Sequence, residues 1–467
     1  MEKIIVLFQK DLRLHDNLAL IAAAKRGVVI PLFIFSEDDR IVRGSAAACY
    51  LHDALCALKE ELSTKQLTLT IRSGNKSEVL HQFVKETGAQ AIYTNYRTGN
   101  EKIENPSIYV HYFSDMLLRS SEDFYNVTGD TYKIYSAFYK RFLHYTVEQP
   151  KQTPTQIAHS TELYPSLTIE QLALLPTLAW STTVRAHWQA GEHSALKKWR
   201  NFLQNEIYDY KEGRDIPSQQ ATSMLSTYLA FGEISVRTMW YMLKEAQQMI
   251  LNNAHLESVV TYEKQLIWRE FAYYKLTHYP TMPTMSLRSQ FQAFPWQEDC
   301  TVVDNWQKGH TGYPIVDAGM RQLWQTGWMH NRVRMIVASF LVKHLLIRWQ
   351  VGERWFADTL VDFDVAINAL SWQWSAGCGI DAAPYFRIFN PILQGQKFDA
   401  TGEYIKKWVP ELAHIPAEYI HEPWKAPAPI LKNVRVNLGE TYPYPIVDHV
   451  FARERALAAY AQIKRKG

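Results

Sequence analysis

The sequence predicts an N-terminal α/β domain with a parallel, Rossmann-like sheet, followed by an all-helical domain. In the first third of the chain, short β-branched runs alternate with helical segments, which is typical of a parallel sheet. Helical periodicity then persists to the C-terminus, and all 15 tryptophans lie at or after Trp180. Because 467 residues exceed one ordinary core, we place an α/β domain at 1–127, a linker at 128–193 and a helical domain at 194–467.

The elements of the first third follow from runs of strand length and the helical patterns between them. Strands are predicted at 4–8, 28–35, 67–72 and 91–95, and helices at 45–62 and 77–87. Ligands of such sheets bind at the carboxyl ends of the strands. The chain has no G-x-G-x-x-G and no Walker loop, so an ordinary dinucleotide or ATP site is not supported. The polar loop at 9–17 favours a salt-bridged turn over a catalytic site.

For the rest of the chain, the sequence predicts a connector followed by helices. Proline-rich stretches at 149–154 and 164–166 indicate a connector that wraps the surface. Helical spacing of apolar residues begins near Ser194. Further helices are predicted at 235–252, 256–277, 315–326, 331–349 and 450–464.

The composition indicates a soluble globular protein, with 47% hydrophobic and 21% charged residues. No window approaches the roughly 18 continuous apolar residues of a membrane span, and the first residues read as a strand rather than a signal peptide. The four cysteines form no C-x-x-C pair, which disfavours a disulfide framework or a zinc site and favours the cytoplasm. A net charge of +3 permits nucleic-acid binding only where positive residues cluster.

Two polar clusters precede the tryptophan-rich region. The turn at 210–215 and the segment at 221–226 could present backbone N–H groups and hydroxyls to a phosphate, although the pattern favours a helix N-cap. In the helix at 256–277, Gln265, Trp268 and Arg269 share a face. That face fits base stacking with phosphate pairing or, equally, a buried Trp–Arg patch.

The stretch at 328–374 is the densest in polar groups and indoles, which indicates a cofactor pocket beside an aromatic path. Asn331, Arg334 and Met335 recur there at helical spacing. Asp362 and Asp364 follow, without the histidine, cysteine or glycine-rich loop of a metal site. We interpret these acids as acceptors for the N–H groups of a heterocycle or as partners of Arg334.

Three indoles in separate segments adjoin the candidate pocket, namely Trp296, Trp349 and Trp372. Buried tryptophan is usually packing, so their positions alone favour packing over an electron relay.

Taken together, these segments resemble the photolyase/cryptochrome family, most closely its class I cyclobutane pyrimidine dimer photolyases. The matching motifs stand in family order at 11–17, 213–215, 268–271, 311–317, 327–332 and 381–391. The resemblance implies an α/β antenna domain, a linker and a helical domain that holds FAD in a U-shaped conformation. It also implies that light would excite reduced flavin, which would pass an electron to a pyrimidine dimer that is flipped out of the duplex. The dimer would then split and the electron would return.

The resemblance also assigns the cofactor contacts. The flavin's phosphates and ribityl region would contact Tyr210, Thr222, Ser223, Met224, Leu225 and Ser226. Its ring system and adenine would be surrounded by Gln265, Trp268, Arg269, Asn331, Arg334, Asp362 and Asp364. Asn368 would face the flavin N5, as in photolyases.

For the DNA, Trp268, Met335 and Trp374 match residues that line the lesion cavity, and Arg332, Arg387 and Lys397 are expected phosphate contacts. Stacking of an indole on a base is worth about 1–3 kcal/mol, so the two tryptophans should contribute much of the damage recognition. Asn331 and Met335 stand where (6-4) photolyases carry histidines, which argues against that branch.

The family's photoreduction chain matches Trp372 nearest the flavin, then Trp349, with Trp296 outermost. The resemblance therefore replaces the packing interpretation of these three indoles by an electron relay.

Gln265 departs from the family pattern, because dimer photolyases usually have glutamate there. An amide can donate a hydrogen bond to a thymine carbonyl but cannot supply a proton. We expect lesion binding to be retained, the repair quantum yield to be lower, and Gln265→Glu to raise it.

The antenna and the partners follow from the same resemblance. Asn100 and Glu101 resemble the pair that binds methenyltetrahydrofolate, although a deazaflavin or an empty site stays open. The expected partner is UV-damaged DNA, duplex or single-stranded. We expect a cytoplasmic monomer that associates with the nucleoid when bound to damage, and no membrane partner.

Two rival functions use the same pocket. A cryptochrome-like photoreceptor would signal through a partner, and Gln265 keeps this alternative open, whereas the short tail after the last predicted helix favours the enzyme. A light-independent protein that binds damaged DNA would need no indole chain.

Overall fold

The computed structural model describes residues 1–36, 40–96, 103, 108–122 and 124–464. They form two compact units. Unit 1 consists of Met1–Lys211, Ser223–His278 and Val361–Asp364, and unit 2 consists of Glu212–Thr222, Tyr279–Leu360 and Val365–Gly467. These units are defined by packing, whereas the domain boundaries at 127 and 193 follow the sequence pattern and stay a prediction.

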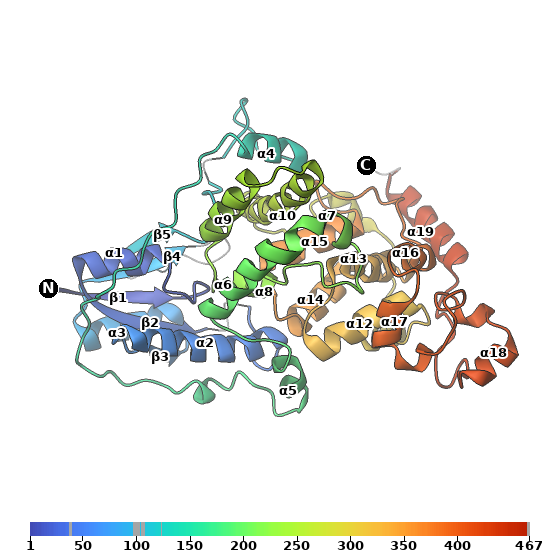
Figure 1. Cartoon of the computed structure of the whole chain (residues 1–467), viewed down its shortest axis with the longest axis horizontal. Helices are drawn as coiled ribbons and strands as arrows, with labels where there is room; N and C mark the ends of the chain where they lie inside the picture. The colour runs from blue at the N-terminus through green and yellow to red at the C-terminus, as the bar shows by residue number, and fades with distance from the viewer. Residues whose placement is uncertain (37–39, 97–102, 104–107, 123, 465–467) are drawn as a thin grey trace. The chain divides into compact units, whose positions relative to one another are not determined.

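A parallel five-stranded sheet lies in unit 1, as the sequence predicts. Its order is β3-β2-β1-β4-β5, and its strands are drawn in blue and cyan in Figure 1. The central strand β1 is buried from Ile4 to Phe8 and pairs with β2 from Glu2↔Gly27 to Phe8↔Phe33. The strands are β1 Glu2–Phe8, β2 Gly27–Phe35, β3 Thr70–Ser73, β4 Ala91–Tyr96 and β5 Tyr109–Ser114.

One strand, β5, is absent from the sequence prediction. It pairs with β4 alone at the sheet edge and has no buried residue, only half-buried and exposed ones. An edge strand without a buried face lacks the hydrophobic alternation by which a strand is recognised.

Helices make up most of the remaining chain. In the first part they are α1 Leu18–Arg26, α2 Ala46–Thr64, α3 Lys76–Thr87, α4 Tyr135–Phe142, α5 Trp180–Arg185, α6 Glu192–Asn201, α7 Tyr210–Gly213, α8 Ser226–Ala230, α9 Val236–Gln248 and α10 Asn253–His278. The later ones are α11 Cys300–Lys308, α12 Pro314–Thr326, α13 Asn331–Ser339, α14 Trp349–Thr359, α15 Val365–Ala376, α16 Pro391–Phe398, α17 Glu403–Trp408, α18 Ala428–Asn433 and α19 His449–Lys464. In the described part of the chain, none of them has the length and apolarity that a bilayer crossing requires.

The prediction of one continuous helix at 331–349 is wrong. α13 ends at Ser339, a π-helical turn follows at Phe340–His344, and Leu346 has a left-handed φ of 55°. α14 then starts at Trp349. The residues before and after this break are apolar and buried. The hydrophobic periodicity of the sequence therefore does not indicate where the helix ends.

The linker region contains the short helices α4 and α5. Its proline-rich part forms hydrogen bonds with the loop after β1. The Lys151 N–H donates to Asp16 at 2.7 Å, and the Thr153 hydroxyl donates to the Leu14 carbonyl at 2.6 Å. Within unit 1, these hydrogen bonds hold the connector against the loop after β1.

Candidate functional site

The predicted site residues fall in both units. Unit 1 contains Tyr210, Ser223, Met224, Leu225, Ser226, Gln265, Trp268, Arg269, Asp362 and Asp364. Unit 2 contains Thr222, Trp296, Asn331, Arg332, Arg334, Met335, Trp349, Asn368, Trp372, Trp374, Arg387 and Lys397. The predicted antenna residues Asn100 and Glu101 lie outside the described residues.

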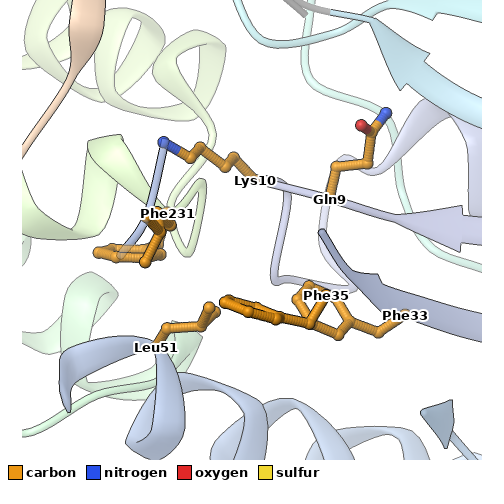
Figure 2. A pocket seen from close by; sticks show the side chains of 7 residues that line it. Gln9, Lys10, Phe33, Phe35, Leu51 and Phe231 are labelled. Atoms are coloured by element: carbon orange, nitrogen blue, oxygen red, sulfur yellow. The ribbon is translucent and has the colours of Figure 1, made fainter. Parts of the chain in front are cut away.

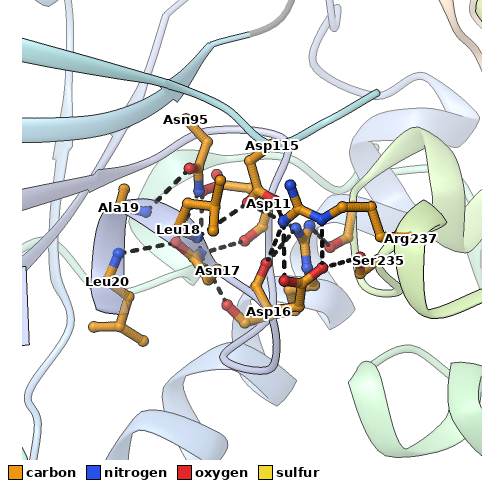
Figure 3. Close-up of polar contacts among 12 residues, drawn as sticks. Asp11, Asp16, Asn17, Leu18, Ala19, Leu20, Asn95, Asp115, Ser235 and Arg237 are labelled. Atoms are coloured by element: carbon orange, nitrogen blue, oxygen red, sulfur yellow. Dashed lines mark hydrogen bonds and ion pairs between the residues drawn. The ribbon is translucent and has the colours of Figure 1, made fainter. Parts of the chain in front are cut away.

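The loop after β1 is fixed by a buried ion-pair network within unit 1 (Figure 3). Asp115 accepts from Arg13 at 2.7 Å and from Arg237 at 2.6 Å. Arg237 also pairs with Asp16 at 2.9 Å, and Asp16 accepts from the Ser235 hydroxyl. Burial raises the pKa of Asp115 to about 6 although both arginines lower it. The salt-bridged turn favoured by the sequence is therefore confirmed.

A pocket lies at the carboxyl ends of β1 and β2 in unit 1 (Figure 2). It is lined by Gln9, Lys10, Phe33, Phe35, Ile41, Leu51 and Phe231, and it opens to solvent. The Arg43 guanidinium lies 4.6 Å from the centre of the Phe35 ring. Aromatic walls with a few polar groups are typical of sites for flat ring compounds, and this edge of the sheet is where the sequence predicts a ligand.

The turn before α8 is strained and is not a side-chain N-cap. The N-cap position is Leu225, which has no capping hydrogen bond. The preceding Met224 has a left-handed φ of 49°, a conformation that often marks ligand sites. The Ser223 hydroxyl pairs with the Tyr262 hydroxyl at 2.9 Å instead of capping the helix. The favoured N-cap interpretation is therefore wrong, and the phosphate site stays a prediction.

α10 presents Gln265 and Trp268, both half-buried, one turn apart. The Gln265 amide nitrogen donates to the Thr261 carbonyl at 3.1 Å. The Trp268 indole stacks on Tyr135, with ring centroids 3.6 Å apart and planes 7° from parallel. The amide and the indole are thus held in place and remain accessible to a ligand.

Arg269 is more deeply buried than its two predicted neighbours on α10. Its guanidinium lies 3.4 Å from the Glu270 carboxylate and over the Tyr273 ring. Glu270 also accepts from the Leu118 N–H at 2.9 Å, and burial raises its pKa to about 7. The Tyr273 hydroxyl donates to Asp364. Arg269 and Asp364 therefore belong to one buried polar cluster.

α13 presents its predicted site residues in unit 2 as the helical spacing implies. Asn331 is exposed, and Arg334 and Met335 are half-buried. The His330 Nδ1 accepts from the Arg332 N–H at 3.3 Å and so caps the helix. Burial lowers the pKa of His330 to about 4, so the imidazole is neutral. This cap orients the first turn, and sequence reasoning missed it.

Asn368 is held by Glu353 within unit 2. Its amide nitrogen donates to the Glu353 carbonyl at 3.2 Å and to the carboxylate at 3.0 Å. Because both acceptors require a donor, the amide nitrogen is fixed on this side. The Asn368 side-chain oxygen is therefore left as an acceptor.

Of the three predicted relay indoles, the two inner ones are buried and the outermost one is half-buried. Trp372 and Trp349 are 2% and 0% exposed, whereas Trp296 is half-buried. A Cβ at Gly352 would lie 2.1 Å from the Trp372 ring. Since Gly352 is one turn after Trp349 on α14, the two buried indoles both lie where α14 meets α15.

Sequence reasoning missed the residues that fix Trp349. The Ser286 hydroxyl accepts the Trp349 indole N–H at 3.0 Å. The loop that carries Ser286 is held by Gln373, whose amide nitrogen donates to the carbonyls of Met282 and Met285 at 2.7 and 2.8 Å. A glutamine between two tryptophans of an apolar helix is a polar residue in a buried position, and this signal could have identified it.

Two of the predicted phosphate contacts share an aromatic support in unit 2. Arg332 lies 4.4 Å and Lys397 5.1 Å from the centre of the Phe398 ring. Arg332 also pairs with Asp215 at 2.7 Å. Lys397 and Arg387 are exposed. The exposed cations can reach a phosphate without losing a buried partner.

Two family models match the chain. The model described as DNA photolyase matches residues 4–156, which include the sheet, and the model described as FAD binding domain of DNA photolyase matches residues 262–462. A parallel α/β region followed by a helical FAD-binding region defines the protein as a flavin-binding α/β–helical protein.

Full-length relatives define it further. The chain is 44% identical to deoxyribodipyrimidine photo-lyase of Agrobacterium fabrum, over 99% of this chain and 98% of that protein. It is 35% identical to cryptochrome-2 of Arabidopsis thaliana, over 99% of this chain and 79% of that protein. The chain belongs to the photolyase/cryptochrome family.

Solved structures are similar over the same length. A bacterial class III photolyase from Agrobacterium tumefaciens has a TM-score of 0.94 and 42% identity, covering 100% of this chain and 98% of that one. An archaeal photolyase from Sulfolobus tokodaii, solved with two FAD molecules, has a TM-score of 0.79 and 28% identity, covering 98% and 100%. The family resemblance and the predicted fold class are confirmed, whereas assignment to class I stays a prediction.

Proposed function

We propose that this protein uses light and bound FAD to repair cyclobutane pyrimidine dimers in DNA. The observation that carries the proposal is the pairing on α10 of a half-buried, face-stacked indole, Trp268, with the amide of Gln265. An indole gives an extruded base a stacking surface, and a damaged pair costs less to extrude than an intact one. The photo-lyase relative that is 44% identical over the full chain supports this activity.

The residues present fit FAD. The Asn368 side-chain oxygen, fixed by Glu353, can accept a hydrogen bond from a protonated ring nitrogen. The buried Trp372 N–H has no acceptor among the described residues, as expected where a ligand completes a site. The other proposed contacts are Tyr210, Thr222, Ser223, Met224, Leu225, Ser226, Arg269, Asn331, Arg334, Asp362 and Asp364. When bound, FAD would supply the photoexcited electron donor.

For the lesion, we assign stacking to Trp268 and Trp374 and a flexible apolar contact to Met335. Each of these side chains is half-buried, so each can cover a base and still reach solvent before binding. Gln265 contributes a hydrogen-bond donor and no proton. A carbonyl of the dimer would therefore be held but not protonated by this side chain.

For the strand, we assign phosphate contacts to Arg332, Arg387 and Lys397. Such contacts position the protein on DNA and carry no sequence information. They also make binding fall with salt concentration.

The three tryptophans would move oxidising equivalents outward through the protein. Trp372 and Trp349 are shielded from water, and Trp296 is half-buried, so it can exchange electrons with a reductant in solution. The hydrogen bond from Trp349 to Ser286 would fix the middle indole.

For the antenna, we propose that the pocket at the ends of β1 and β2 takes a flavin or deazaflavin ring. Its three phenylalanines suit a flat ring system, and Gln9 and Lys10 can bind polar edges. The two FAD molecules in the archaeal relative support a second flavin-class ligand. A folate at Asn100 and Glu101 is the competing assignment. An absorption band at about 380 nm that persists when the flavin is bleached would favour the folate over the flavin-class ring, because antenna absorption is a property of the bound pigment.

The second candidate function is a cryptochrome-like photoreceptor. Gln265 favours it, because an amide replaces the usual acid, and the cryptochrome relative is 35% identical over this chain. The two functions share the cofactor and the indole relay, so they differ only in what the excited flavin does to DNA.

The deciding experiment is a repair assay on dimer-containing DNA, illuminated and dark, with protein loaded with FAD. Repair in light alone supports the proposal. Binding to the damaged DNA without repair in light supports either the photoreceptor or a light-independent damage binder. A photoreceptor would still photoreduce its flavin, whereas a light-independent damage binder would not. We propose action as a monomer in the cytoplasm, on duplex or single-stranded DNA, in association with the nucleoid when damage is bound.

A further inference from the structure

Tyr135 on α4 covers one face of the Trp268 indole. The ring centroids are 3.6 Å apart and the planes differ by 7°, so the two rings are stacked face to face. α4 lies beside α10 (Figure 1). The two residues are 133 positions apart in the sequence, so the stack is a tertiary contact that no motif contains.

Tyr135 is itself fixed at both ends. Its hydroxyl donates to the Lys264 carbonyl on α10 at 2.8 Å. Its ring stacks on Tyr139, one turn later on α4, with centroids 5.9 Å apart and planes 28° from parallel. Phe271 meets the rings of both Tyr135 and Trp268 edge-on, at 5.7 Å in each case. The phenol cannot rotate without breaking these contacts.

Simple packing of α4 on α10 does not require this stack. Phe138 on the same helix is 2% exposed, and its ring packs on Phe271 and Tyr274 of α10 at centroid distances of 5.1 and 5.0 Å. Tyr135 and Trp268 are both half-buried. Their stack therefore stands at the border of the helix contact, where Trp268 can still meet a ligand.

We propose that Tyr135 is a positioning residue for damage recognition, which holds the plane of the Trp268 indole so that its other face can stack on an extruded base. The inference rests on the proposed function. Binding then orders no indole rotamer, because the rotamer is already set, and side-chain ordering is one of the costs that weaken association. Tyr135 touches no base and acts through Trp268 alone.

A double-mutant cycle tests this role. The variants are Tyr135→Leu, Trp268→Leu and the pair, and the probe is a duplex oligonucleotide with one thymine dimer, bound in the dark by the FAD-loaded protein. Tyr135→Leu should weaken dimer binding about 2- to 13-fold, which corresponds to the about 0.5–1.5 kcal/mol that an aromatic pair is worth beyond burial. Binding to undamaged duplex should not change. In the Trp268→Leu background the same change should have no further effect.

Two controls separate positioning from stability. Tyr135→Phe keeps the ring, so it should bind the dimer like the parent protein, and near-ultraviolet circular dichroism should retain the stacked-pair signal. Tyr139→Leu removes a ring of the same helix that stacks on Tyr135 rather than on Trp268, and its effect should be smaller than that of Tyr135→Leu.

The outcomes are distinguishable. An equal loss of affinity with and without Trp268 would overturn the inference, because Tyr135 would then act elsewhere. If Trp268→Leu weakened dimer binding and Tyr135→Leu did not, the proposed role of Tyr135 would be overturned, while the proposed role of Trp268 would stand. If Trp268→Leu itself left dimer binding unchanged, the proposed role of Trp268 would fail as well.

Discussion

The contact between Gly352 and Trp372 allows the position of the innermost relay indole to be tested. The change is Gly352→Ala on α14. The added Cβ would lie 2.1 Å from Cη2 of Trp372 and 2.6 Å from two further ring atoms. Non-bonded carbon atoms normally approach to about 3.5–4.0 Å. The indole ring must therefore move away by about 1 Å or more, or the two helices must separate.

The expected magnitude is the difference of two effects. Overpacking of a core costs about 1–3 kcal/mol, whereas replacing a mid-helix glycine by alanine stabilises by about 0.5–1 kcal/mol. Gly352→Ala should therefore lower the free energy of unfolding by up to about 2 kcal/mol. In a Trp372→Phe background the clashing ring atoms are gone, and the same change should stabilise the protein.

Urea unfolding of the four proteins measures this coupling, and photoreduction of bound FAD measures its functional side. The coupling free energy between the two sites should be about 1–3 kcal/mol, and photoreduction should slow in Gly352→Ala because the first indole has moved. Equal stabilisation by alanine in both backgrounds would refute the packing of the Trp372 ring against Gly352 of α14.

Three further predictions follow from the other contacts. Gln265→Glu should raise the yield of dimer splitting per absorbed photon, because an acid can protonate the dimer, and an unchanged or lower yield would count against this role. Ser286→Ala leaves the Trp349 N–H without its acceptor, which should cost about 1–3 kcal/mol in urea unfolding; no loss of stability would mean that water replaces the hydroxyl. Burial raises the pKa of Glu270 to about 7, above about 4.3 in the unfolded chain. The stability that this group contributes is full below the unfolded pKa and lost as pH rises through about 7, so Glu270→Gln should remove up to about 4 kcal/mol of pH dependence across that window. An identical pH profile for the parent protein and the variant would contradict the raised pKa.

The sequence predicted the elements with a strong local pattern. The strand at 4–8 is a run of apolar residues, and it is the buried centre of the sheet. The strand at 109–114 was missed because only a strand with a buried face shows alternation. The break at Leu346 was missed because buried apolar residues surround it, and a left-handed φ at a leucine has no sequence signal.

The site residues were named by resemblance, but the contacts that fix them were not. Glu353 orients Asn368, and Gln373 holds the loop that fixes Trp349. Tyr135 sets the plane of Trp268 from a distant part of the chain. Such partners come together only on folding, and neither periodicity nor motif spacing describes contacts between remote segments.

The most direct test of the account is uptake of FAD by the purified protein, followed by absorption spectroscopy. The account predicts a coloured complex whose flavin is reduced on illumination with an external donor, with Trp372→Phe slowing that reduction. A protein that is colourless and takes up no flavin on reconstitution would contradict the account as a whole.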